Sequence, residues 1–326
     1  MNIENRQGIA VAGTVLVDKI NEIAAYPQSG ELTKILNLDK SVGGCVPNVA
    51  VDLKKISPEL DISAIGKIGN DDEGKYVLEV MGQAGVDTSG MVISDMDRTS
   101  FTEVMSVING QRTFFTYPGA SADFGYADMK LEQMKSRILH LGYFLLLQKV
   151  DEGEGLEILK KATELGLKTS IDLVSENSDR YSIVLPCLPH TDYLIINEHE
   201  AGKLTNMEPT DENLEAITRK LMDLGVREKV IIHKPEYALC LSKEGLTMVG
   251  SYKLPKGYIK GTTGAGDAFC AGALIGIYHE WSDKEILEFA SACAVMALGS
   301  ADATSGLKTA EEVKSFCEQF DRIQVR

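Results

Sequence analysis

A glycine-rich turn at residues 261–267 is the stretch of this chain best suited to chemistry on a phosphate. It reads GTTGAGD and leads into a small, apolar run from residue 270 to 279 that fits a buried helix. Amides at a helix N-terminus lack partners within the helix and attract anionic oxygen. An aspartate there is unfavourable beside phosphate unless it accepts a proton from an attacking hydroxyl, which is the role predicted for Asp267. The turn equally fits a helix entry with Asp267 as N-cap.

A second polar cluster, Asn197-Glu-His-Glu200, directly follows a predicted strand at residues 192–196. Ligands of open parallel sheets collect beyond the carboxyl ends of the strands. An amide and a carboxylate at that edge can hold a hydrated Mg²⁺, which prefers oxygen ligands. The alternative is that Asn197 caps the next helix, and for this cluster alone that alternative is favoured.

A third candidate is the segment 42–48, which reads VGGCVPN and precedes a helical run at 49–56. The glycines Gly43 and Gly44 would let a ligand approach the backbone, and Asn48 offers a donor and acceptors to hydroxyl groups. Asp18, just after the first predicted strand, could pair with vicinal hydroxyls. A plain loop before a helix is the alternative.

The elements that must position these residues alternate between short β-like runs and helical patterns, which is typical of a parallel sheet with crossover helices. We expect strands at 8–12, 62–65, 168–174, 192–196, 230–233 and 238–241, and helices at 71–83 and after residue 152. Residues 22–42 and 99–117 break this rhythm. The second has Asn109-Gly110 at a hairpin position, and both predict antiparallel strands beside the main sheet. The expected fold is a doubly wound, mostly parallel α/β sheet with a small inserted β-sheet lid.

Composition limits the partners. The 326 residues contain 33 Lys and Arg against 48 Asp and Glu, a formal net charge of −15. That field repels phosphate backbones, so we expect no nucleic-acid partner, although a local patch could hold one nucleotide. No apolar run approaches the roughly 20 residues of a membrane span and no signal peptide is visible, so we expect a cytoplasmic protein without a membrane partner. Six scattered cysteines without a CxxC pair argue against disulfides or structural zinc.

The order of the three motifs resembles the ribokinase-like carbohydrate kinases of the PfkB family. Residues 65–74 (IGKIGNDDEG), residues 85–88 (GVDT) and the lid-like residues 112–120 agree with the resemblance. The match runs from about residue 8 to residue 307, and the GAGD segment followed by AF is its most specific part. The resemblance implies one ribokinase-like kinase domain over residues 1–326, with lid segments at about 14–42 and 98–120.

The resemblance also implies an ATP- and Mg²⁺-dependent kinase that phosphorylates a hydroxyl of a small sugar. Asp267 matches the catalytic base, and the amides of the GAG segment match an anion hole that stabilises the transferred group. The lid would close over the sugar and exclude water. The residues matched by role are Gly264, Ala265 and Gly266 for the anion hole, Asn197 and Glu200 for Mg²⁺ (through water) and phosphate, Asp18, Gly43, Gly44 and Asn48 for the sugar, and Ser291 for the adenine pocket.

Three departures from the family pattern, together with Arg112 of the lid strand, bear on substrate and cofactors. Gly261 stands where many members have an aspartate that helps to hold a monovalent cation, which puts potassium activation in doubt. A TxGxxG turn is replaced by residues 233–238, in which Lys234 could supply charge to the phosphates or be a solvated surface lysine. Lys149 stands where ribokinases carry a carboxylate, so ribose is less attractive. Arg112 could hold a carboxylate or phosphate bidentately, or face solvent.

The expected acceptor is the primary alcohol of an unphosphorylated monosaccharide. A nucleoside kinase, or a non-catalytic sugar- or nucleotide-binding protein on the same scaffold, are the alternatives. A homodimer through the lid strands is also expected, because exposed sheet edges have unpaired backbone groups that can bond to another strand.

Overall fold

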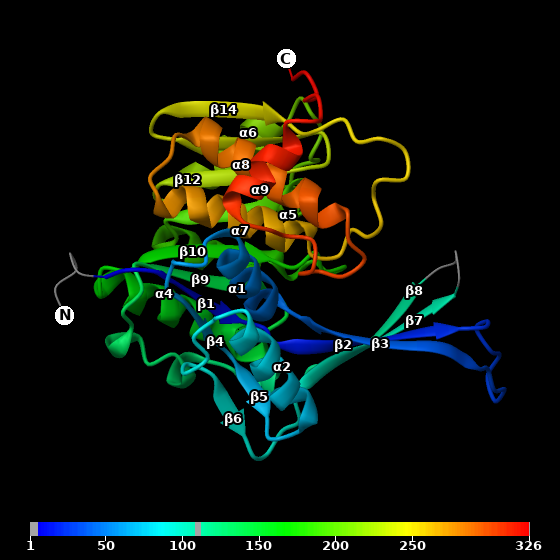
Figure 1. Cartoon of the computed structure of the whole chain (residues 1–326). Helices are drawn as coiled ribbons and strands as arrows, with labels where there is room; N and C mark the ends of the chain where they lie inside the picture. Colours follow the sequence, from blue (N-terminus) through cyan, green and yellow to red (C-terminus); the bar gives the residue numbers. More distant parts are fainter. Residues whose placement is uncertain (1–5, 108–111, 326) are drawn as a thin grey trace.

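A mostly parallel eight-stranded sheet forms the centre of the molecule (Figure 1). The computed structural model describes residues 6–107 and 112–325. The strand order is β14-β13-β12-β11-β10-β9-β1-β4, in which the strands from β4 to β12 run parallel and β13 and β14 are antiparallel additions. The strands are β1 (Ile9–Gly13), β4 (Ile62–Ile65), β9 (Ile138–Phe144), β10 (Lys168–Leu173), β11 (Tyr193–Asn197), β12 (Lys229–His233), β13 (Tyr237–Ser242) and β14 (Gly245–Gly250).

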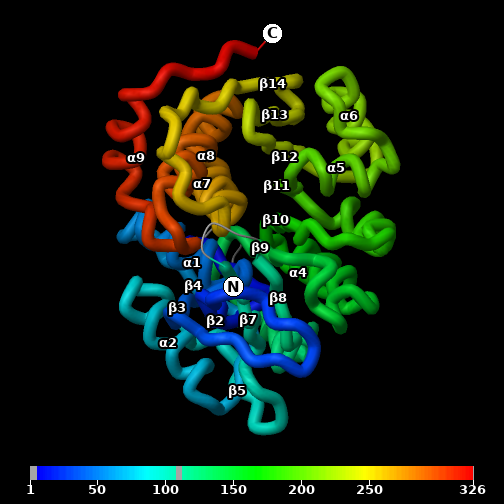
Figure 2. Tube along the Cα trace, turned by 90° about the vertical axis from the view of Figure 1, so that its right-hand side faces the viewer, coloured from blue at the N-terminus to red at the C-terminus, as the bar shows by residue number. Residues whose placement is uncertain are grey.

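Helices cover both faces of this sheet, as Figure 2 shows, and this confirms the doubly wound α/β class. One face carries α1 (Cys45–Ile56), α7 (Ala265–Tyr278), α8 (Asp283–Leu298) and α9 (Ala310–Cys317), and the other carries α4 (Gly155–Glu164), α5 (Glu198–Thr205) and α6 (Leu214–Asp223). The remaining helical segments are α2 (Asp72–Gln83), α3 (Gly119–Ala122), the 3₁₀ segments Tyr126–Asp128, Leu131–Gln133 and Arg180–His190, and a π-turn at Val150–Glu154.

Two hydrophobic cores result, one on each face of the sheet. In β1 the side chains alternate between them, with Ile9 and Val11 in one core and Ala10 and Ala12 in the other. This alternation follows from the two-residue period of a strand. Because both faces are covered, the strands read as continuous apolar runs. Helix α7 is apolar all round and is buried between the sheet and α8, as its sequence predicts.

The two segments that break the sequence rhythm form a separate four-stranded sheet, called the lid sheet here, with the order β3-β2-β7-β8. It projects from one end of the central sheet (Figure 1). The prediction of antiparallel strands is wrong for one pair, because β2 runs parallel to β7. A period-two pattern predicts a strand but not its direction. The chain between β2 and β7 passes through α1, β4 and α2, and a connection of this length allows the two strands to pair in parallel. The strands are β2 (Leu16–Ile23), β3 (Ile35–Gly43), β7 (Ser100–Val107) and β8 (Arg112–Tyr117), with a small pair β5 (Lys67–Gly69) and β6 (Val92–Ser94) nearby.

The hairpin predicted at Asn109-Gly110 lies outside the described residues. Among residues 6–107 and 112–325, no helix combines the length and apolarity that crossing a bilayer requires. The cytoplasmic location stays a prediction.

Candidate active site

A pocket of about 180 Å³ opens where four neighbouring strands of the central sheet, β9 to β12, reach their carboxyl ends. The first turn of α7 closes one side of it. This is the position at which open parallel sheets bind ligands. Its polar lining residues and glycines are Tyr143, Asp172, Ser175, Asn197, Glu200, His233, Gly264, Gly266, Asp267 and Cys270.

The glycine-rich turn enters α7 without a side-chain cap. Gly264 is the N-cap, with φ +79°, and a Cβ there would lie 2.5 Å from the Cα of Ala303, so only glycine fits. Asp267 is the third residue of the helix, so the prediction that Asp267 could be the N-cap is wrong. Its carboxylate instead bonds to two residues from distant parts of the chain.

The predicted anion-hole residues differ in how available their amides are. The amide of Ala265 donates to the carbonyl of Thr262 over 3.3 Å. Gly266 belongs to the first helical turn, whose amides have no acceptor further back in the helix. A Cβ at Gly266 would meet nothing closer than His233 Cε1 at 3.9 Å, so this glycine faces open space in the pocket.

The Asp267 carboxylate is buried and accepts hydrogen bonds from two sides. Asn48 Nδ2 donates to Oδ2 over 2.9 Å, and the Tyr143 hydroxyl lies 3.0 Å from both Oδ1 and Oδ2. Burial and the nearby Asp172 charge together raise the pKa of Asp267 to about 7, against the lowering effect of the two donors. A carboxyl with this pKa can take up a proton at neutral pH.

Asn197 and Glu200 form a capping box at the start of α5. Asn197 Oδ1 accepts from the Glu200 amide over 2.9 Å, and Glu200 Oε2 accepts from the Asn197 amide over 3.1 Å. Ser175 joins the pair, donating to Glu200 Oε1 over 2.8 Å and accepting from Asn197 Nδ2 over 2.9 Å. The capping alternative for Asn197 is thus confirmed, and the box holds both side chains at the pocket.

Three carboxyl groups lie at the pocket. Asp172, Glu200 and Asp267 line it, and its lining within the described part of the chain includes neither lysine nor arginine. Burial raises the pKa of Glu200 to about 8, and burial lowers the pKa of His233 to about 4, so this histidine is neutral at pH 7. Three carboxyl groups without a basic side chain would repel a bare phosphate, but they fit a phosphate that arrives with a divalent cation.

Two of the predicted sugar-contact residues, Asp18 and Asn48, lie near Asp267. The Asp18 charge contributes to the raised pKa of Asp267, and burial raises the pKa of Asp18 itself to about 6. A Cβ at Gly43 would lie 2.5 Å from Asp18 Oδ2, so the glycine makes room for this carboxylate. Gly44 is the N-cap of α1, which carries Asn48. Within the described residues, buried Asn48 Oδ1 has no hydrogen-bond partner, so it is free to accept one from a ligand hydroxyl.

The structure does not bring three other predicted residues to Asp267. Lys234 is held by Asp211 and Glu236, with Nζ–O distances of 2.8 and 3.2 Å. Ser291 is buried in α8, with 5 % of its surface exposed. Arg112 is exposed at the start of β8, where it pairs with Ser106 of β7. Asp18 pairs with Thr102, four residues earlier in β7, so Arg112 and Asp18 lie at different levels of the lid sheet.

Sequence reasoning missed Tyr143, Asp172 and Ser175, which also line the pocket. Asp172 and Ser175 stand at the end of the predicted strand 168–174, so their place at a strand end was the available signal. Tyr143 had no comparable motif around it. Its placement depends on a left-handed backbone at φ 60°, which the residue type does not predict.

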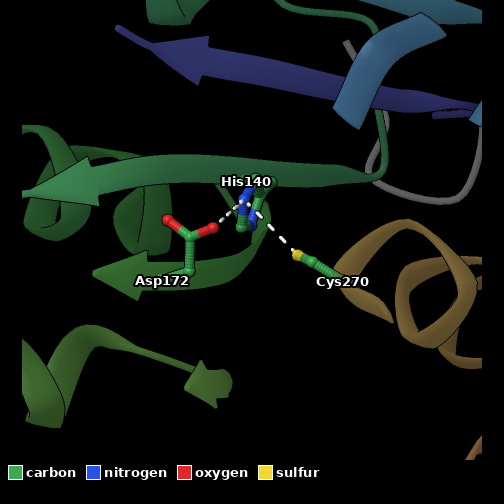
Figure 3. A group of neighbouring side chains, drawn as sticks. All are labelled: His140, Asp172 and Cys270. Carbon is green, nitrogen blue, oxygen red and sulfur yellow. Dashed lines mark hydrogen bonds and ion pairs between the residues drawn. The ribbon is translucent and has the colours of Figure 1, made fainter. Parts of the chain in front are cut away.

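Behind the pocket, His140 lies close to Asp172 and Cys270, side chains from β9, β10 and α7 (Figure 3). His140 Nε2 is 3.6 Å from Asp172 Oδ2 and 3.6 Å from Cys270 Sγ, and Nδ1 is 3.1 Å from Ser170 Oγ. Both ring nitrogens therefore have neighbours, and burial raises the pKa of the Cys270 thiol. The cluster joins the two strands to the helix that carries Asp267.

A family model described as pfkB family carbohydrate kinase matches residues 9–310. The chain belongs to this family. Among curated relatives, this pfkB family kinase is 28 % identical to the probable chloroplastic fructokinase-6 of Arabidopsis thaliana, covering 84 % of this chain and 74 % of the relative. It is 26 % identical to the ribokinase of Schizosaccharomyces pombe, covering 94 % of this chain and 96 % of the relative.

The fold of this pfkB family kinase is that of solved ribokinases. The structure of Arabidopsis thaliana ribokinase complexed with ribose and ATP superposes with a TM-score of 0.84, covering 96 % of this chain and 99 % of that chain at 23 % identity. At this identity the likeness shows the fold. Together with the family match, it confirms the carbohydrate-kinase class predicted from the three motifs.

Proposed function

We propose that this carbohydrate kinase transfers the γ-phosphoryl group of ATP to a hydroxyl of a small sugar, with Asp267 as the general base. The observation that carries the proposal is the first turn of α7, where the amides of Gly266 and Asp267 have no acceptor further back in the helix and a buried carboxylate lies beside them. The amides suit an anionic phosphoryl group and the carboxylate suits a hydroxyl proton. Both groups needed for in-line transfer thus lie on one rigid element.

In this mechanism the acceptor hydroxyl lies between Asp267 and the phosphate. Asn48 Nδ2 orients the carboxylate, and its unpartnered Oδ1 accepts a hydrogen bond from a sugar hydroxyl. The hydroxyl proton passes to Asp267 as its oxygen bonds to phosphorus, and the bond from phosphorus to the leaving ADP oxygen breaks. The amides of Gly264 and Gly266 stabilise the charge that spreads over the transferred group, whereas the Ala265 amide already donates to a backbone carbonyl. A pKa of about 7 suits a base that works near neutrality.

The pocket also suits Mg²⁺. Asn197 and Glu200 would hold the ion through water, and their oxygens are the ligand type that Mg²⁺ prefers. When bound, the ion supplies positive charge that offsets the charge of the phosphates and of the three carboxyl groups. Chelation of divalent cations is therefore expected to stop turnover.

The proposed acceptor is a primary hydroxyl of an unphosphorylated monosaccharide. The two curated relatives described above carry the names fructokinase and ribokinase, which supports this class. Lys149, where a sugar-binding carboxylate is expected in ribokinases, forms an ion pair with Asp123, with an Nζ–Oδ1 distance of 2.5 Å. This pairing supports a sugar other than ribose.

The decisive experiment measures ADP release with ATP and Mg²⁺ across ketoses, aldoses, sugar acids, sugar phosphates and nucleosides, with and without potassium. One strong monosaccharide response is expected. A response only to nucleosides would replace the proposed acceptor, and a response to acids would assign a role to Arg112. Thermal stabilisation by a sugar without any ADP release would overturn the kinase mechanism in favour of a binding protein. The potassium arm tests the departure at Gly261.

We also propose that two copies associate through their lid sheets. Large apolar side chains are exposed on both edge strands, with Leu38 at 70 % and Phe115 at 59 % exposure. The strand register puts these two on the face of the lid sheet opposite to Asp18. Exposed edges and apolar patches favour association with another chain.

A further inference from the structure

The hydroxyl of Tyr143 lies on the Asp267 carboxylate. Tyr143 is the next-to-last residue of β9, and its oxygen lies 3.0 Å from each carboxylate oxygen. The ring lines the pocket, and α7, which carries Asp267, comes from a part of the chain 124 residues away. The phenol proton is therefore shared between both oxygens of the candidate base.

The backbone of Tyr143 is held in an unfavourable conformation to make this contact. Its φ is 60°, a region that residues with a large side chain rarely adopt. Asp172 Oδ1 accepts the Tyr143 amide over 2.6 Å, and Oδ2 of the same carboxylate lies beside His140 (Figure 3). A conformation of this kind persists only where its surroundings enforce it, and such positions concentrate at functional sites.

We propose that Tyr143 is a positioning residue, which keeps the Asp267 carboxylate ionised and turned toward the acceptor hydroxyl. This inference rests on the proposed function, in which Asp267 is the base. Two donors from opposite sides, Tyr143 and Asn48, fix the rotation of the carboxylate. A carboxylate has about four acceptor positions, so these two donors leave room for the acceptor hydroxyl.

The electrostatic surroundings explain why such a donor is needed. Burial and the acidic neighbours Asp172 and Asp18 all raise the pKa of Asp267 and so favour its protonated form. A phenol donates a hydrogen bond to the ionised form without adding a competing charge. The titratable groups whose charges couple to Asp267 are Asp18 from β2, Cys45 and Asp52 from α1, Asp172 from β10 and Cys270 from α7. Glu200 from α5 and His233 from β12 line the same pocket.

The test compares Tyr143→Phe with Tyr278→Phe in the full-length protein. The control removes a phenol that accepts from the Gly8 amide over 3.1 Å at the other end of α7. Carboxyl titrations are followed by NMR of ¹³C-labelled aspartate, with Asp267 assigned through Asp267→Asn. Tyr143→Phe is expected to raise the Asp267 pKa by about one pH unit, the effect of losing one hydrogen bond to a charged group. Tyr278→Phe should leave it unchanged, and an unshifted Asp267 in Tyr143→Phe would overturn the proposal.

Kinetics then separate positioning from a structural role. The acid limb of the kcat/KM profile should move up by the same amount in Tyr143→Phe, with little change in the KM for ATP. A uniform loss at all pH values, or a gain in activity showing that the phenol blocks the site, would contradict the proposal. If the unmodified protein phosphorylates nothing, the proposed function fails, while the NMR titration still decides the contact between Tyr143 and Asp267.

A reciprocal measurement covers the case in which Tyr143→Phe does not fold. With ring-labelled tyrosine, the Tyr143 phenol is expected to titrate at lower pH in Asp267→Asn than in the unmodified protein, because the Asp267 charge raises its pKa. An unchanged phenol titration would then overturn the contact.

Discussion

At the scale of the single residue, the raised pKa of Asp267 has opposite effects on stability and on activity. The burial of Asp267 and the nearby Asp172 raise its pKa to about 7, which makes the ionised form costly to the fold. The same pKa makes it a better proton acceptor near neutral pH than an exposed aspartate. A residue of this kind is expected to serve activity at the expense of stability.

Asp267→Asn should separate these two effects. Turnover is expected to fall by about 10² to 10⁴, the usual range for losing a general base. At pH 8 the folded aspartate is ionised at a cost, because its folded pKa lies above its ordinary value of 3.8. The variant should therefore unfold in denaturant no earlier than the unmodified protein at pH 8. Near-normal turnover would show that Asp267 is not the base.

At the scale of the element, the same helix-capping motif has different properties in two places. The capping boxes at α5 and α8 have the same residue pattern, but Glu200 in α5 is 4 % exposed at the pocket, whereas Glu285 in α8 is on the surface. Burial raises the pKa of Glu200 to about 8, while hydrogen bonds from Ser282 lower the pKa of Glu285. One motif thus stabilises a helix in both places and gives a titrating group at the pocket in only one.

Glu200→Gln should make stability less dependent on pH. The folded protein keeps the Glu200 proton up to about pH 8, whereas the unfolded chain loses it near its ordinary pKa of 4.5. Raising the pH between these values therefore favours unfolding. In the variant, the free energy of unfolding should fall by up to about 1.4 kcal/mol less per pH unit than in the unmodified protein. Urea unfolding from pH 5 to 8 measures this difference. Glu285→Gln is the control, and an equal effect of both variants would refute the assignment.

At the scale of the whole molecule, the central sheet and the lid sheet have different burial. The central sheet is covered by helices on both faces, but the lid sheet exposes apolar side chains on both edge strands. Arg112 and Phe114 are two residues apart in β8, so their side chains lie on the same face of the lid sheet. The strand register puts Asp18 of β2 on this face as well. The other face carries Leu38 and Phe115 and is the one proposed for association.

Phe115→Glu should shift the protein toward monomer in sedimentation or light-scattering measurements. A charge in an apolar interface costs free energy in the dimer and little in the monomer, where residue 115 is exposed. Met96→Glu is the matched control, because Met96 is 91 % exposed outside the lid sheet. An unmodified protein that is monomeric at all concentrations, or a dimer that both variants leave intact, would refute association through the lid.

Much of this molecule follows from local sequence. The apolar runs at residues 8–12, 62–65 and 168–174 predict the buried strands, because strands covered on both faces have no polar side. The GTTGAGD turn predicts a helix entry with free amides, and its glycines allow the φ of +79° at Gly264. These features depend on neighbours within a few positions, so fold class and kinase class were within reach of the sequence.

Tertiary structure alone decided what surrounds the base and the strand ends. Tyr143 and Asn48 meet Asp267 from 124 and 219 residues away, and Asp172 reaches Tyr143 from the neighbouring strand. The direction of β7 against β2 and the pairing of Lys234 with Asp211 likewise depend on the path of the whole chain. Contacts of this range carry no local pattern, because their geometry is set by how the sheet and helices pack. Residue types and their spacing therefore predicted a kinase, while packing determined which side chains hold its base.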